Sequence, residues 1–219
     1  MLALASIQSQ MPVKQPITGQ SRNLGQSLLR NHRSTGRRVL SGSYRHYYTG
    51  MFMALAGVTM LFAAFTSAYI VRQGISDDWQ SATIPGILWP NTLILIVSSL
   101  TLERARKFSE NQHRFSRWWM ATVGLGIIFL LGQFWAWRQL ALNGIYLSSN
   151  PSSSFFYLLT ATHGIHLLGG LAGLQLVCWR VWQGSHVAPR STILGVTALY
   201  WHFMSGLWIY IFLLFLIWG

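Results

Sequence analysis

The sequence predicts an all-α membrane protein, a bundle of five transmembrane helices with its N-terminus in the cytoplasm and its C-terminus outside. Apolar residues make up 52% of the 219 residues and charged residues only 9%, far below the quarter that is usual in soluble domains. The apolar residues gather in long runs, each close to the ~20 residues that cross a hydrocarbon core about 30 Å thick. The formal charge of +12 comes from basic residues between those runs, so we expect a membrane and no nucleic acid as the partner.

Residues 1–47 form the first predicted domain, a basic cytoplasmic arm. They hold seven Lys and Arg and no acidic residue, with many Ser and Gln and no sustained apolar pattern. An Arg- and Ser-rich start without acids is also typical of a mitochondrial transit peptide, but we interpret it as a retained arm of mostly irregular structure. We expect the arm to lie on anionic lipid or an acidic partner, with a solvated tail as the alternative.

Residues 48–219 form the second predicted domain, which contains the five membrane spans. We place the spans at about residues 48–71, 85–102, 118–137, 154–179 and 192–218. Pro85 and Pro90 lie at the start of the second span, and Pro151 lies just before the fourth. Helix N-termini tolerate proline, so these positions agree with helix starts.

The second span carries polar residues that repeat at an interval of seven, namely Asn91, Thr92, Ser98 and Ser99. Residues seven apart lie on one face of a helix. We therefore expect these side chains to hydrogen-bond to neighbouring helices. The stretch that follows, residues 103–117, has five basic and two acidic residues and is too polar to enter the membrane.

The distribution of Lys and Arg predicts the orientation of the chain. With the N-terminus in the cytoplasm, the cytoplasmic parts hold fourteen Lys and Arg, and only Arg72 and Arg138 lie outside. This asymmetry agrees with the positive-inside rule. Some of the cytoplasmic residues are expected to contact lipid phosphates or acidic surfaces. They are Arg104, Arg106, Lys107 and Arg180.

The fourth span contains two histidines three residues apart, at His163 and His166. On a helix both lie on one face, which Gly170 and Gly173 continue. Gly169 and Gly173 also form a GxxxG pattern, the small-residue spacing that lets two membrane helices approach closely. Because polar side chains at membrane depth are expensive, this face is expected to contact protein, water or a lipid headgroup.

His202 is the one histidine of the fifth span. His163 lies about nine residues into its span and His202 about ten, so at ~1.5 Å per residue both come near mid-membrane, where they are able to meet. Three imidazoles are able to ligate a metal or a haem. The alternative function is therefore a haem b-binding electron-transfer protein that uses His163 or His166 together with His202.

Two observations oppose that alternative. The four acidic residues, Asp77, Asp78, Glu103 and Glu110, all lie outside the spans or at their ends, whereas di-iron bundles and proton relays need carboxylates inside. Stacked bis-histidine haems need four histidines on two helices, and the spans hold three. We expect structural imidazoles that hydrogen-bond between helices or to a lipid headgroup, with no catalytic residue, cofactor or metal held by this chain.

The stretch FYLLTATHGIHLLGGLAGL, residues 156–174, resembles the T-x-x-H-x-x-H-x-x-x-G helix of cytochrome c oxidase subunit III. The motif YWHF at residues 200–203, which includes Trp201, is followed by Trp208. Together they resemble the last helix of that family. Further similar stretches are FAAFTSAYIVR (62–72), NTLILIVSS (91–99, beginning at Asn91) and GQFWAW (132–137, with Gln133). The resemblance covers residues 48–219, and five helices are similar to the short bacterial form without the family's first pair.

The resemblance implies a haem-free and copper-free subunit of a proton-pumping haem–copper oxidase in the bacterial inner membrane. It implies that the chain stabilises the catalytic subunit I, encloses phospholipid and supports proton uptake from the cytoplasmic side during aerobic respiration. The implied partners are subunits I and II, which hold the haem and copper, with a small subunit IV and a respiratory supercomplex as further candidates. Subunit III of a quinol oxidase is a second alternative, because the electron donor is left open.

Three departures from the family pattern concern acids inside the membrane. The resemblance places acids at the positions of Val58, Ala136 and Ser205, and this sequence has none of them. Any role of those acids in proton handling therefore does not carry over. The packing role does carry over, because it depends on glycine, histidine and aromatic positions that are present.

Overall fold

A computed structural model of the chain describes residues 18–75, 85–147, 150–182 and 190–218, with side chains from residue 46 onward except at 180–182 and 190. The chain divides into two units, Met1–Ser43 and Tyr44–Gly219.

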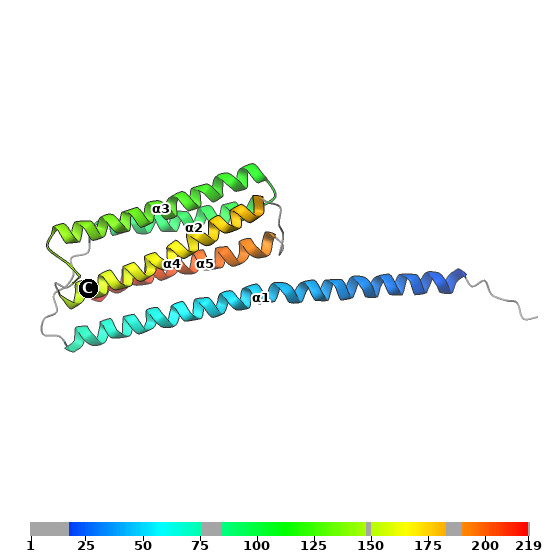
Figure 1. Cartoon of the computed structure of the whole chain (residues 1–219), viewed down its shortest axis with the longest axis horizontal. Helices are drawn as coiled ribbons and strands as arrows, with labels where there is room; N and C mark the ends of the chain where they lie inside the picture. The colour runs from blue at the N-terminus through cyan, green and yellow to red at the C-terminus, as the bar shows by residue number, and fades with distance from the viewer. Residues whose placement is uncertain (1–17, 76–84, 148–149, 183–189, 219) are drawn as a thin grey trace, which may run out of the picture. The chain divides into compact units, whose positions relative to one another are not determined.

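All regular structure in the described residues is helical, as the sequence predicts. The helices, in order, are α1 (Thr18–Ile75), α2 (Leu88–Lys107), α3 (Gln112–Leu142), α4 (Pro151–Trp182) and α5 (Arg190–Trp218) (Figure 1). α4 begins at Pro151, where the proline was expected to start a helix. The all-α fold with five helices is thereby confirmed.

Helix α1 begins thirty residues earlier than the predicted first span, at Thr18. The expectation of a mostly irregular arm is wrong for residues 18–47, and residues 1–17 lie outside the described residues. The physical reason is that no proline occurs between Pro16 and Pro85, so nothing interrupts the backbone hydrogen bonds of a continuous helix. Leu, Arg and Gln in this stretch are also good helix formers.

Four segments of the described residues are long and apolar enough to cross a membrane. They are His46–Ile75, Gln112–Leu142, Pro151–Trp179 and Ser191–Trp218. Helix α2 differs because the last five of its 20 residues include Glu103, Arg104, Arg106 and Lys107. Its passage through the membrane and the positions of the two chain ends stay predictions.

Helices α2 to α5 form a closed ring in which α3 packs on α2 and α4, and α5 packs on α4 and α2 (Figure 1). Asn91 at the start of α2 contacts the carbonyl of Phe129, whereas Ser98 further along contacts the carbonyl of Thr122. Since the contact moves backwards along α3 as it moves forwards along α2, the two helices are antiparallel. The arrangement is that of an up-and-down four-helix bundle.

The buried residues of the bundle recur at alternating steps of three and four along each helix. This spacing averages 3.5 residues and produces a continuous seam facing the partner helices. On α2 the seam is Leu88, Asn91, Leu95, Ser98, Leu102 and Ala105; on α3 it is Phe115, Trp119, Thr122, Gly126, Phe129, Gln133, Ala136 and Leu140. On α4 it is Phe156, Thr160, His163, Leu167, Gly170 and Leu174; on α5 it is Leu194, Ala198, Trp201, Ser205, Trp208, Phe212 and Phe215.

Helices α2 and α3 are joined by four residues, a much shorter connection than the polar stretch 103–117 suggested. The side chain of Asn111 accepts a hydrogen bond from the backbone N–H of Arg114 at 3.2 Å and so caps α3. At its other end α3 ends at Leu142, and Gly144, just after the C-cap Asn143, has a φ of +77° that favours glycine. The N–H groups of Gly144 and Ile145 return to Ala141 and Leu140, which closes the helix in a Schellman motif.

Within the second unit, α1 is attached to α4 and α5 through long side chains. Tyr69 donates a hydrogen bond to the carbonyl of Trp218 at 2.9 Å, and its ring lies 5.7 Å from Phe155. About two turns earlier, Phe62 lies 5.9 Å from the ring of His166. Most other residues of His46–Ile75 are exposed, so α1 presents a large apolar surface.

Candidate functional site

His163 lies at the centre of the bundle and is completely buried. Its ring centroid is 5.2 Å from that of Trp208 and 6.0 Å from that of Phe129, which meets it edge-on. Neither ring nitrogen has a hydrogen-bond partner among the described residues. The imidazole therefore packs as one ring within an aromatic cluster contributed by α3, α4 and α5.

His166 is half-buried and faces α1. Its Nδ1 lies 2.8 Å from the carbonyl of Thr162, one turn back on α4, so Nδ1 carries the proton and donates. The carbonyl of His166 accepts a hydrogen bond from the hydroxyl of Tyr200 at 2.8 Å. This residue of α4 thus contacts both α1 and α5.

His202 contacts α2 and not the other two histidines. Its Nδ1 meets the hydroxyl of Ser99, and its Nε2 lies 3.6 Å from Oε2 of Glu103. His163 instead lies against Trp208, which is six residues, or about 9 Å of helix, further along α5. His163 and His202, which the sequence placed at similar depths and so able to meet, have different neighbours in the structure, because the register of α5 on α2 directs His202 toward the polar end of α2.

The polar residues of α2 bond to both neighbouring helices, as expected from their spacing. Asn91 donates to the carbonyl of Phe129 at 3.1 Å, and Ser98 donates to that of Thr122 at 3.0 Å. On the other side, Nε1 of Trp208 donates to Thr92 at 3.0 Å. The expectation of interhelical hydrogen bonds is confirmed.

Phe129 is a central residue that motif reasoning missed. Its carbonyl accepts the bond from Asn91, and its ring lies 4.9 Å from Trp208 and 6.0 Å from His163. Gln133, one turn further along α3, is 2% exposed, and its amide has no hydrogen-bond partner among the described residues. Phe129 and Gln133 both belong to the series of α3 residues that recurs at steps of three and four. That spacing is the sequence signal by which both could have been identified as buried.

Three glycines are in close contact inside the bundle. A Cβ at Gly126 would lie 2.9 Å from Cη2 of Trp201, and one at Gly170 would lie 2.7 Å from Cε1 of Tyr200. A Cβ at Gly132 would collide with Oδ1 of Asn91. Small residues at these positions allow the large rings and the amide to fit between the helices.

Gly169 and Gly173 are not in close contact within the described residues. A Cβ at either position would meet nothing within 4 Å, and Gly169 is exposed. The GxxxG pattern therefore does not bring two helices of this chain together. A close approach at Gly169 and Gly173 stays a prediction for a helix of another subunit.

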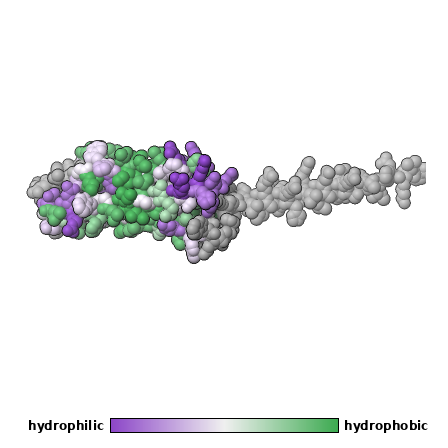
Figure 2. All heavy atoms as spheres, turned by 90° about the horizontal axis from the view of Figure 1, so that it is seen from above, coloured by the Kyte–Doolittle hydropathy of each residue, from purple (hydrophilic) through white to green (hydrophobic). Residues whose placement is uncertain are grey.

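The basic residues expected at the cytoplasmic side lie at the end of the bundle where α2 turns into α3. Arg104 and Lys107 are exposed, whereas Nη1 of Arg106 lies 2.8 Å from Oε2 of Glu103. The side chain of Arg180 lies outside the described residues. Figure 2 shows hydrophilic residues at the ends of the bundle and a hydrophobic band between them.

The positions of the three absent acids are all in contact with the core. Ala136 is completely buried, Ser205 is 6% exposed, and Val58 packs against the core. The hydroxyl of Ser205 donates to the carbonyl of Trp201 at 2.9 Å, within its own helix. These positions therefore contribute no charge to the interior of the bundle.

In the part of the chain with described side chains, no three His, Cys, Asp or Glu residues lie close enough to hold a metal ion.

The comparisons with known proteins agree with this arrangement. The family model described as cytochrome c oxidase subunit III matches residues 45–219. Cytochrome c oxidase subunit 3 of Synechocystis is 32% identical over 173 residues, which are 75% of this chain and 72% of that protein. The probable cytochrome c oxidase subunit 3 of Mycobacterium bovis is 31% identical, and the subunit 3 of Thermostichus vulcanus is 30% identical. These alignments cover 74% and 75% of this chain and 83% and 84% of the relatives. The chain is therefore a multi-pass bacterial membrane protein that belongs to the cytochrome c oxidase subunit III family.

Proposed function

We propose that the chain is a non-catalytic subunit that stabilises the catalytic subunit of its oxidase, binds phospholipid and supports proton uptake. As a member of its family it is a subunit of an oxidase complex. The observation that carries the proposal is the use of the buried polar groups: Asn91, Ser98 and Trp208 all bond to neighbouring helices. His163 lies in the same core against aromatic rings. Side chains placed in this way hold helices together and leave little room for a reacting molecule.

The partners that we propose are subunits I and II, a small subunit IV and, at a higher level, a respiratory supercomplex. The exposed side chains of α1 support this proposal. Met53 is 73% exposed, Met60 75% and Val71 58%. Such an apolar surface is suited to lipid tails or to the helices of another membrane subunit.

Support for proton uptake rests on the charged end of α2. Arg104 and Lys107 are exposed at this end. Their positive charges would attract lipid phosphates or the acidic surface around a proton entry. The absent acids at Val58, Ala136 and Ser205 exclude a relay through those positions. The contribution of this chain to proton uptake is therefore electrostatic and structural.

Depletion of this chain from the purified oxidase tests the proposal. We expect the haem and copper content per catalytic subunit to stay unchanged, as measured by metal analysis and reduced-minus-oxidised spectra. Turnover is expected to begin near the normal rate and to decline over successive cycles, because the uncovered core loses lipid and structure. A stoichiometric loss of haem with the chain would contradict the proposal and support haem ligation by His163, His166 or His202.

A further inference from the structure

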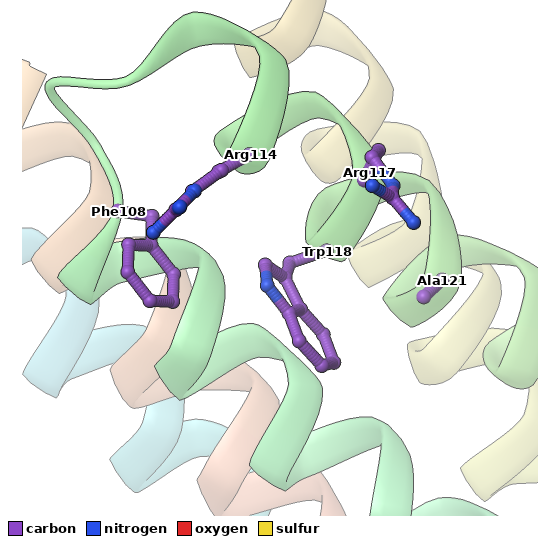
Figure 3. Close-up of a pocket in the computed structure, with 5 residues that line it drawn as sticks. All are labelled: Phe108, Arg114, Arg117, Trp118 and Ala121. Carbon is purple, nitrogen blue, oxygen red and sulfur yellow. The ribbon is translucent and has the colours of Figure 1, made fainter.

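A cavity of about 460 Å³ lies at the turn between α2 and α3. It is lined by Phe108, Arg114, Arg117, Trp118 and Ala121 (Figure 3). Figure 3 shows Trp118 between the Phe108–Arg114 pair on one side and Arg117 with Ala121 on the other. None of these residues belongs to the histidine and glycine positions discussed above.

Two guanidinium groups give the cavity a positive lining. Arg114 lies over the ring of Phe108 at 5.4 Å from its centroid, and outside the lining Arg104 lies 5.2 Å from the centroid of Trp118. The cation–π contact with Phe108 holds the guanidinium of Arg114 against an aromatic ring. A guanidinium group is suited to bidentate contact with a phosphate.

Among the described residues that line the cavity, none carries a carboxylate. Glu103, on the preceding helix, is paired with Arg106 at 2.8 Å and lies 3.6 Å from His202. Glu110 lies on the turn and is exposed, but it is not among the lining residues. The charge of Arg114 and Arg117 is therefore not neutralised from within the lining.

The lining changes from charged to apolar along α3. Ala121 lies four residues, or about 6 Å, beyond Arg117, and the apolar part of α3 continues from there. A ligand that fills this space has an anionic group at one end and an apolar group at the other. The volume is roughly fifteen times the ~30 Å³ share of one water molecule in the liquid, which is larger than a free phosphate ion needs.

We infer that this cavity binds the headgroup of an anionic phospholipid, with Arg114 and Arg117 attracting its phosphate from the two sides of Trp118 and with its glycerol and first methylenes against Trp118 and Ala121. The inference rests on the membrane location and lipid binding in the proposed function and assigns a specific site to them. This site is separate from the lipid contacts expected of Arg106 and Lys107, because neither residue lines the cavity.

Fluorescence quenching by brominated lipid tests the inference on the full-length chain. A bimane probe is attached at Met120→Cys in a Cys178→Ala background, since Met120 is exposed and adjoins the lining without being part of it. The chain is placed in phosphatidylcholine bicelles and titrated with brominated phosphatidylglycerol. We expect half-maximal quenching at a mole fraction at least fivefold lower than with brominated phosphatidylcholine.

The double variant Arg114→Gln/Arg117→Gln is expected to raise that mole fraction at least tenfold. Its matched control is Arg106→Gln/Lys107→Gln, which removes the same charge from the same end of the bundle but no lining residue. Because Lys107 is itself proposed to attract lipid phosphates, we expect the control to raise the mole fraction two- to threefold, well short of the tenfold effect. An equal loss in both would overturn the inference, because it would indicate general attraction to a basic surface. Arg114→Lys/Arg117→Lys keeps the charge and should recover most of the affinity; failure to do so would also overturn it.

Inorganic phosphate distinguishes a lipid site from a site for free anions. Non-brominated phosphatidylglycerol should reverse the quenching, whereas inorganic phosphate at the same concentration should not. Reversal by phosphate alone would overturn the assignment to a lipid. Thermal unfolding in phosphatidylcholine alone checks that each variant is folded. The haem and copper content of the oxidase is independent of this test, so failure here is distinguishable from failure of the proposed function.

Discussion

Substitution of Gly170 by alanine is expected to destabilise the contact between α4 and α5. A Cβ at this position would lie 2.7 Å from Cε1 of Tyr200 and 3.3 Å from Cδ1. Since ordinary contacts begin near 3.4 Å, the ring must retreat by about 0.7 Å. It is not free to do so, because the hydroxyl of Tyr200 is bonded to the carbonyl of His166 at 2.8 Å.

The magnitude follows from three contributions. Overpacking of a well-filled core costs about 1–3 kcal/mol, and weakening of the Tyr200 hydrogen bond costs up to about 1 kcal/mol more. The greater helix propensity of alanine offsets roughly 1 kcal/mol of this. We expect Gly170→Ala to lower the free energy of unfolding by about 2 kcal/mol as the sum of these terms.

Reversible unfolding by sodium dodecyl sulfate in mixed micelles, followed by tryptophan fluorescence, measures this free energy. The adjacent Gly169→Ala is the matched control, because its Cβ meets nothing within 4 Å in the chain and only the favourable helix propensity remains. The double variant Gly170→Ala/Tyr200→Phe releases the ring from His166 and should recover part of the loss. A Gly170→Ala variant as stable as the wild type would refute the reasoning.

Two further predictions concern the aromatic cluster and the topology. Trp208→Phe removes the hydrogen bond to Thr92 and part of a buried ring, and should cost about 2 kcal/mol in the same unfolding assay. Trp208→Ala removes the ring contacts as well and should cost about 3–5 kcal/mol; equal costs would contradict the assigned ring contacts. In Cys178→Ala cells, an impermeant thiol reagent added outside should label Asn143→Cys and not Glu110→Cys. The reverse pattern would mean that the positive-inside count gives the wrong orientation.

The sequence was sufficient to predict the helices of the second unit because each apolar run is bounded by clear polar or proline signals. The interhelical hydrogen bonds of α2 were also predictable, because an interval of seven places Asn91 and Ser98 on one face of the helix. It did not predict the helix before residue 48, because Ser, Gln and Arg lack an apolar period. Continuity without proline, not amphipathicity, extends α1 through that stretch.

The partners of the histidines were less predictable, because they depend on how far one helix is shifted along its neighbour. Depth in the membrane placed His163 and His202 at similar heights, but the register on α2 separates them. The same limit applies to the glycines. The GxxxG pattern drew attention to Gly169 and Gly173, whose Cβ positions meet nothing within 4 Å, whereas Gly170, which the sequence placed on the histidine face, is the one in close contact with Tyr200.

The positions without acids and the buried His163 share one property, which is that each lies in an environment suited to an uncharged side chain. A carboxylate at Ala136 would be completely buried on the seam of α3, where it would need a compensating charge or several donors. The chain instead has a methyl group there, and His163 lies among aromatic rings that suit a neutral imidazole. Ser205, at the third such position, satisfies its hydroxyl with its own helix. With Val58, Ala136 and Ser205 in place of acids, these three positions put no carboxylate into the core, which agrees with the helix-packing role that we propose.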